Sequence, residues 1–107
     1  MSKEIEETIK ASREMSHKWT PADILAKLLE ETGEFSAAIQ TERGVLNKQR
    51  EHREHTFEEA ADSFICILDA LAETHKDISE EKVLQLLEKW IRLKREKWIV
   101  KLTPKKE

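Results

Sequence analysis

Residues 20–44 read TPADILAKLLEETGEFSAAIQTERG, and this stretch determines the fold class. Its apolar residues recur every three or four positions, the spacing of one face of an α-helix: Ile24, Leu25, Leu28, Leu29, Phe35 and Ile39. Thr20 can accept a hydrogen bond at the helix start, Pro21 suits the first turn, and Gly44 suits the C-terminal cap. The stretch therefore predicts a helix from Pro21 to about Arg43.

The segments on either side of this helix show the same spacing. Residues 2–18 carry a thin apolar stripe of Ile5, Ile9 and Met15, which predicts a first helix. Residues 45–55 are polar and cationic and predict a connection. From Thr56 onward apolar residues again follow helical spacing, and Thr56 with Glu59 three residues later matches a capping box. A third helix is expected from Thr56 to about Ala72.

The last predicted helix runs over 80–100, with Ser79 as its cap and Pro104 beyond its end. Four helices with short connections are the components of a four-helix bundle. We therefore expect one all-α domain over 1–107, with its core at about 19–100. The last helix crowds four large apolar residues, so we expect dimerisation to complete the bundle: Trp90, Trp98, Ile91 and Ile99.

Composition supports this fold class and excludes others. The 107 residues include two Gly, two Pro and no Tyr, whereas a β-sandwich or barrel needs many turns and aromatic or β-branched strands. A net charge of −3 provides no general attraction for nucleic acid. The single cysteine, Cys66, lies in an apolar run and is expected in the core. With no span of about 20 apolar residues and no signal peptide, we expect no membrane contact and a cytoplasmic protein.

Two acidic strings stand apart from the scattered surface charge. One is Glu30, Glu31 and Glu34; the other is Glu58, Glu59 and Asp62. Residues three apart share one side of a helix, so Glu31 pairs with Glu34, and Glu59 pairs with Asp62. If the two helices pack antiparallel, four carboxylates can converge, and their repulsion favours a divalent cation between them. Oxygen ligands indicate Mg²⁺ or Mn²⁺ rather than Zn²⁺.

Helical-wheel geometry distinguishes these acids. Glu31 borders the apolar stripe of its helix, about 60° from Leu28, and is the better candidate for burial. Glu59 and Asp62 lie nearly opposite Phe64, so they meet the first pair only if their helix is covered on both sides. A solvated acidic face is the alternative interpretation, because such spacings also arise by chance in a chain with 22 acidic residues.

The two strings, KLLEETGEF at 27–35 and FEEAADSFI at 57–65, resemble the motifs of MazG-like all-α nucleoside triphosphate pyrophosphohydrolases. The resemblance covers about half the chain, from Trp19 to Leu71. It implies an Mg²⁺-dependent enzyme that cleaves a (d)NTP into a (d)NMP and pyrophosphate, in nucleotide-pool control or house cleaning. It also implies a homodimer or homotetramer. The metal-binding and catalytic residues implied are Glu31, Glu34, Glu59 and Asp62.

Cationic residues in the connection and the last helix either contact phosphates or form a solvated cationic face: Lys48, Arg50, Lys94 and Lys97. Many family members carry an Asn near the last helix, and LKREKWIVKL at 93–102 has none. Trp19 either stacks on a nucleobase or forms a hydrophobic staple with its own helix. His52 and His55 are interpreted as polar loop residues. Two other functions remain open: a catalytically inactive helical interaction module, and a phosphoribosyl-ATP-type pyrophosphohydrolase.

Overall fold

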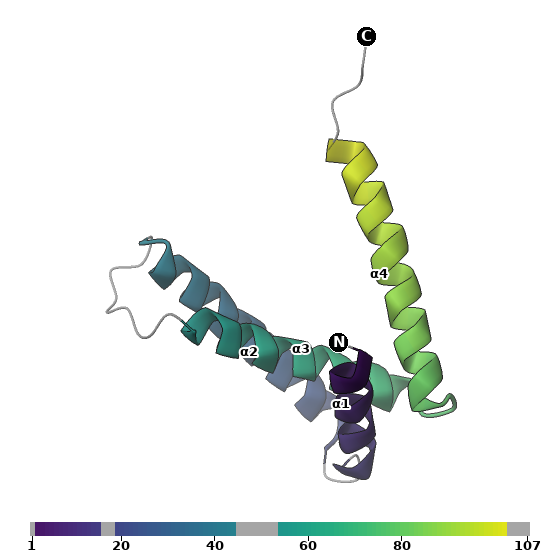
Figure 1. The fold of residues 1–107 in the computed structure, drawn as a ribbon. Coiled ribbons are helices and arrows are strands. Elements are labelled where there is room, and N and C mark those ends of the chain that lie inside the picture. Colours follow the sequence, from purple (N-terminus) through teal and green to yellow (C-terminus); the bar gives the residue numbers. More distant parts are fainter. Residues whose placement is uncertain (1, 16–18, 45–53, 103–107) are drawn as a thin grey trace.

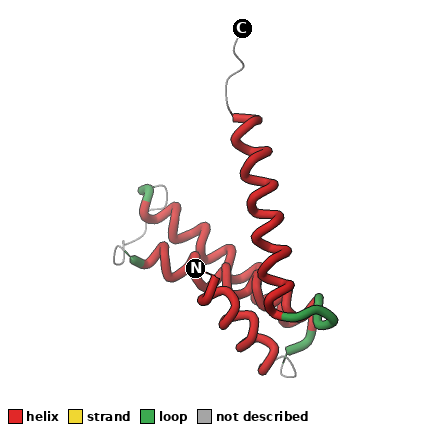
Figure 2. The backbone as a smooth tube through the Cα atoms, turned by 45° about the vertical axis from the view of Figure 1, so that its right-hand side comes forward, coloured by secondary structure: helices red, strands yellow, loops and turns green. Residues whose placement is uncertain are grey.

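The computed structural model describes residues 2–15, 19–44 and 54–102. These residues form four α-helices and no strand (Figure 2). The helices are α1 (Ser2–Met15), α2 (Pro21–Glu42), α3 (His55–Thr74) and α4 (Glu80–Leu102). The all-α prediction is confirmed, and each predicted helix is present within a few residues of its expected bounds.

Local sequence signals explain three of the helix ends. The Thr20 hydroxyl accepts from the Asp23 backbone N–H while the Asp23 carboxylate accepts from the Thr20 N–H, which completes a capping box at the start of α2. Gly44 has a φ of 76°, the left-handed conformation that favours glycine after a helix. The Ser79 hydroxyl accepts from the backbone N–H of Lys82 and caps α4.

The predicted capping box at Thr56 is wrong. Helix α3 already begins at His55, and the residue at its N-cap, Glu54, has helical backbone angles and makes no side-chain capping bond. The backbone N–H of Glu58 instead donates to the Glu54 carbonyl, 3.0 Å away, so the helix starts at His55, one residue before Thr56. Thr56 therefore lies inside the first turn, where its hydroxyl cannot cap.

Helix α3 is the centre of the molecule, because it packs against each of the other three helices. Helices α2 and α3 run antiparallel side by side, and α1 crosses the C-terminal end of α3 (Figure 1). Helix α4 leaves the same end at a wide angle, so that the α2–α3 pair and α4 form two diverging arms. Helix α3 is thus covered on two sides, which is the condition that the sequence set for Glu59 and Asp62 to meet the first acidic pair.

The apolar core lies where these arms join. It consists of Ile5, Ile9, Leu68, Ala72, Val83 and Leu84, contributed by α1, α3 and α4. Ile9 and Leu68 are its largest fully buried side chains. Complete burial of one such side chain contributes roughly 1.5–3 kcal/mol, so these contacts hold α1 and the start of α4 onto α3.

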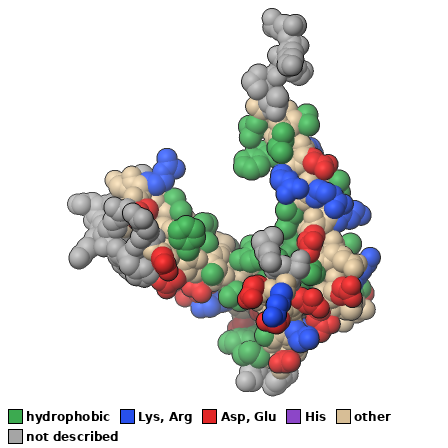
Figure 3. Space-filling model, viewed as in Figure 1, with side chains coloured by type: hydrophobic (Ala, Val, Ile, Leu, Met, Phe, Trp, Pro, Cys, Tyr) green, Lys and Arg blue, Asp and Glu red, His purple; other side chains and the backbone are tan. Residues whose placement is uncertain are grey.

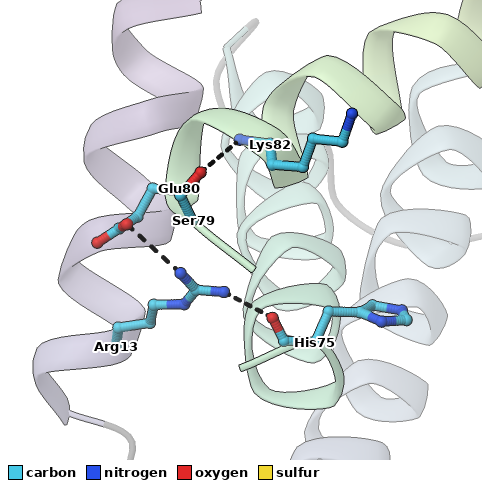
Figure 4. Close-up of polar contacts among 5 residues, drawn as sticks. All are labelled: Arg13, His75, Ser79, Glu80 and Lys82. Atoms are coloured by element: carbon cyan, nitrogen blue, oxygen red, sulfur yellow. Dashed lines mark hydrogen bonds and ion pairs between the residues drawn. The ribbon is translucent and has the colours of Figure 1, made fainter. Parts of the chain in front are cut away.

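Polar contacts of Arg13 also connect α1, α3 and α4 at this junction (Figure 4). The Arg13 guanidinium, on α1, donates to the His75 carbonyl oxygen at 2.8 Å and lies 3.4 Å from the Glu80 carboxylate. His75 follows the end of α3 and Glu80 begins α4, so one side chain links three helices. The carbonyl at a helix end carries partial negative charge, which a guanidinium satisfies.

Beyond this junction, α4 projects from the body. Val83 and Leu84 are buried, whereas every residue from Glu88 to Leu102 is exposed. Its exposed large apolar residues are Trp90, Ile91, Leu93, Trp98, Ile99, Val100 and Leu102. Within the described ranges, no helix has the length and apolarity that crossing a membrane requires.

Candidate metal centre

The candidate centre lies between α2 and α3. Ile24, Glu31 and Ala38 are the buried residues of α2, spaced by seven, and so lie in one row along the helix. Glu31 occupies the middle of this row and is 6% exposed. The buried hydroxyl of Ser63, on α3, donates to the Glu31 backbone carbonyl at 3.0 Å and fixes the register of the two helices. The sequence prediction that Glu31 is more buried than Glu34 is confirmed.

Three carboxylates gather at this point. Glu31, Glu34 and Glu59 each offer an oxygen, and these oxygens all lie within 4.8 Å of one another. Glu31 is buried, Glu59 is half-buried and Glu34 is exposed, so the cluster opens from the helix interface toward solvent. The predicted convergence of acids from two helices is therefore present for these three residues.

In each of the two less exposed carboxylates, those of Glu31 and Glu59, one oxygen lies close to a basic side chain of the same helix. Lys27 Nζ lies 2.8 Å from Glu31 Oε1, and His55 Nε2 lies 3.8 Å from Glu59 Oε1, both one helical turn before the acid. The other oxygens, Glu31 Oε2 and Glu59 Oε2, are buried and have no hydrogen-bond partner in the structure. A buried carboxylate oxygen without a partner is costly, and it marks a place for a donor or a cation.

Electrostatics in the cluster follow from this crowding. The negative charge of Glu31 raises the pKa of the Glu34 carboxyl, and burial and the charge of Glu59 add to the effect. The hydrogen bond to Glu31 raises the pKa of the Lys27 ammonium group. One lysine does not neutralise three carboxylates, so the cluster keeps excess negative charge.

The donor set fits a hard divalent cation. All three gathered ligand atoms are carboxylate oxygens, and two of the carboxylates also hold an orphaned oxygen. Mg²⁺ prefers oxygen ligands and commonly keeps part of its water shell, which the open side at Glu34 permits. The arrangement suits a cation held between two helices and shared with a ligand that approaches from solvent.

The remaining predicted site residues lie in different places. Asp62 is exposed, one turn beyond Glu59 on α3, and is not among the three gathered carboxylates. Lys48 and Arg50 lie outside the described residues. Lys94 and Lys97 are exposed on the projecting part of α4, on the other arm of the molecule (Figure 1).

Trp19 is half-exposed and borders a pocket of about 430 Å³ between α1 and α3. Met15 and Ile65 provide apolar walls, and Asp69 provides a carboxylate. Cys66 also lines this pocket; it is partly buried rather than a core residue, and burial raises the pKa of its thiol.

Two neighbours of the acids are absent from the sequence prediction. Lys27 and His55 each precede a cluster carboxylate by four residues, and His55 is a helix residue rather than the expected loop residue. The signal was available, because side chains four apart meet on a helix.

Comparisons of this chain with protein-family models, curated proteins and solved structures find no match.

Proposed function

We propose that this protein is an Mg²⁺-dependent nucleoside triphosphate pyrophosphohydrolase of the MazG-like type. The observation that carries the proposal is the meeting of Glu31, Glu34 and Glu59 from two antiparallel helices, with two buried carboxylate oxygens lacking partners. These are three of the four metal ligands that the resemblance implies, in the predicted order along the chain. A solvated acidic face would not bury Glu31, which is 6% exposed.

The proposed roles follow from position. Glu31 and Glu59 would hold the cation from the helix interface, and Glu34 would complete its binding from the exposed side. Asp62, one turn along α3, is the proposed fourth ligand. Bound Mg²⁺ would neutralise charge on the phosphates. Lys27 and His55 orient the Glu31 and Glu59 carboxylates through their outer oxygens, as partners of metal ligands commonly do.

The substrate proposed is a canonical or modified (d)NTP, cleaved between its α and β phosphates to a (d)NMP and pyrophosphate. No covalent nucleophile is needed, because a carboxylate can orient the attacking water. We also propose that the enzyme is cytoplasmic and a homodimer or homotetramer, which would complete the bundle that α4 leaves open.

The decisive experiment is incubation of the purified protein with Mg²⁺ or Mn²⁺ and a panel of ribo- and deoxynucleoside triphosphates. Pyrophosphate and orthophosphate are measured separately. We expect pyrophosphate release by wild type and none by Glu59→Gln or Glu34→Gln, with the helical circular dichroism spectrum unchanged. Glu30→Gln, one position before the cluster and exposed, is the matched control and should remain active.

Two results would overturn the assignment. Variants of Glu34 or Glu59 as active as wild type would show that the cluster is not the site. A folded protein inactive on the whole panel and insensitive to Mg²⁺ would favour the helical interaction module. Activity on phosphoribosyl-ATP alone would retain the chemistry and change the substrate.

A further inference from the structure

Lys27 places a positive charge beside the acidic cluster of Glu31, Glu34 and Glu59. Its Nζ lies 2.8 Å from Oε1 of Glu31, which follows one helical turn later on α2. The Lys27 side chain is 57% exposed, whereas the Glu31 side chain is 8% exposed. A flexible stem in solvent therefore carries an ammonium group to an anion that is held at the helix interface.

Lys27 is the single lysine or arginine in α2 and α3, and each of these helices contains five acidic residues. Acidic side chains are visible along this arm in Figure 3. The lysine of the arm contacts Glu31, which is a buried acid. An ionised carboxylate buried beside other carboxylates is costly unless a positive charge lies nearby. Lys27 therefore stabilises the cluster when no metal ion is bound.

Lys76 and Glu73, at the C-terminal end of α3, form a similar pair outside the cluster. Lys76 Nζ lies 3.1 Å from Glu73 Oε2, and the two side chains are 61% and 10% exposed. Glu73 Oε1, like Glu31 Oε2, is buried and has no hydrogen-bond partner. In the part of the chain that the structure describes, the acids that gather around one point are Glu31, Glu34 and Glu59. The two lysine pairs therefore differ in the two additional carboxylates beside Glu31.

A divalent cation at the cluster and the ammonium group of Lys27 would share the Glu31 carboxylate. Glu31 Oε1 contacts the lysine, and Glu31 Oε2 is the oxygen without a partner. Because both positive charges would lie against one carboxylate, they would repel each other. Such repulsion is stronger in a partly buried site, where water and salt screen charges less than at the surface. Each cation therefore makes binding of the other less favourable.

We infer that Lys27 is a built-in counter-ion, which stabilises the empty cluster and lowers its affinity for the divalent cation. The inference rests on the proposed function, because it takes the cluster to be a metal site. It concerns the regulation of that site: the cluster fills only at a cation concentration higher than its carboxylates alone would require. If Lys27 served only to orient Glu31 as a metal ligand, its removal would weaken cation binding. A counter-ion predicts the opposite change.

The test is isothermal titration calorimetry with Mg²⁺ and with Mn²⁺, in the absence of nucleotide, on wild type and on variants of Lys27. We expect Lys27→Met to bind the cation about tenfold more tightly than wild type does, equivalent to about 1.4 kcal/mol. Without added cation, its thermal midpoint should fall by about 4–8 °C, because Glu31 loses its counter-ion. Saturating Mg²⁺ should then raise the midpoint of Lys27→Met by more degrees than that of wild type.

Three further variants make the test specific. Lys27→Arg keeps the positive charge and should bind the cation with the affinity of wild type. Lys76→Met is the matched control: it removes the lysine that pairs with Glu73 and should leave the cation affinity unchanged. Lys27→Gln removes the charge of Lys27 but keeps a polar side chain, so it provides the same test if Lys27→Met does not fold.

The outcomes separate this inference from the proposed function. Unchanged or weaker cation binding by the neutral Lys27 variants would overturn the inference and leave the metal site in place. Equally tight binding by Lys76→Met and Lys27→Met would also overturn it, because the effect would then depend on net charge alone. Absence of cation binding in wild type and in every variant would overturn the metal site itself, and the inference with it.

Discussion

Helix α3 is covered on two sides by contacts of opposite chemistry. Toward α1 and α4 it presents Leu68 and Ala72, fully buried among other aliphatic side chains. Toward α2 it presents Ser63 and Glu59, which meet Glu31 and leave two carboxylate oxygens without partners. Burial alone therefore does not distinguish a structural contact from a candidate site; what distinguishes them is the chemistry of the groups that meet, aliphatic side chains in one contact and crowded carboxylates in the other.

The two contacts should respond differently to conditions. Apolar burial stabilises the fold at any pH near neutrality and in any divalent cation concentration. Crowded carboxylates repel one another unless protonated or bound to a cation. The α1–α3 contact should supply constant stability, whereas the α2–α3 contact should supply stability that depends on its ligand.

Leu68→Ala should have the largest effect, because it empties part of the core. We expect a loss of about 2–5 kcal/mol in the free energy of unfolding, measured by urea titration. Leu29→Ala, at an exposed position, should change it by about 0.5 kcal/mol or less. Any stabilisation by Mg²⁺ should persist in Leu68→Ala if that variant still folds; its loss would show that the two contacts are not independent.

Mg²⁺ should raise the thermal midpoint of wild type in a saturable manner. Binding to the folded state alone contributes about 2.7 kcal/mol at a cation concentration of 100 times Kd. Glu59→Gln should reduce or abolish this shift, because it removes a carboxylate with an orphaned oxygen. Scanning calorimetry measures the thermal midpoints. An equal Mg²⁺-induced shift in wild type and in Glu59→Gln would place cation binding elsewhere.

Ser63→Ala should have a smaller effect. It removes the hydrogen bond to the Glu31 carbonyl and leaves that buried carbonyl with its intrahelical bond only, at a cost of about 1 kcal/mol in the free energy of unfolding. Chemical denaturation measures the change. The Mg²⁺-induced shift should remain, since no cluster carboxylate is altered; a lost shift would make Ser63 essential for the geometry of the site.

The pH dependence should be the smallest effect. The pKa of the Glu34 carboxyl is raised, chiefly by the charge of Glu31, so the folded state keeps this proton after the unfolded chain has lost it. Stability should therefore fall as pH rises from the ordinary glutamate pKa through the raised one. Saturating Mg²⁺ or Glu31→Gln should flatten that slope in urea titrations over this interval. A slope of stability against pH that is unchanged in Glu31→Gln would show that repulsion between Glu31 and Glu34 does not cause the pH dependence.

Sequence periodicity was sufficient to predict four helices, because it depends on spacing within a helix. It predicted the convergence of four carboxylates only on the condition that two helices pack antiparallel; Glu31, Glu34 and Glu59 meet, and Asp62 is not among them. It was insufficient for the start of α3, since Thr56 carries a capping signal that the preceding turn overrides. It also omitted Lys27 and His55, although their spacing was visible. The wide angle of α4 depends on contacts between distant segments, such as Arg13 with Glu80, which no local pattern encodes.

The position of α1 in the core has a consequence for synthesis on the ribosome. Ile5 and Ile9 emerge first, but the side chains that bury them belong to α3 and α4 and emerge more than 50 residues later. The α2–α3 pair joins neighbours in the chain and can form while translation continues, whereas α1 must wait. The nascent chain therefore exposes an isoleucine pair until Val83 and Leu84 have left the exit tunnel.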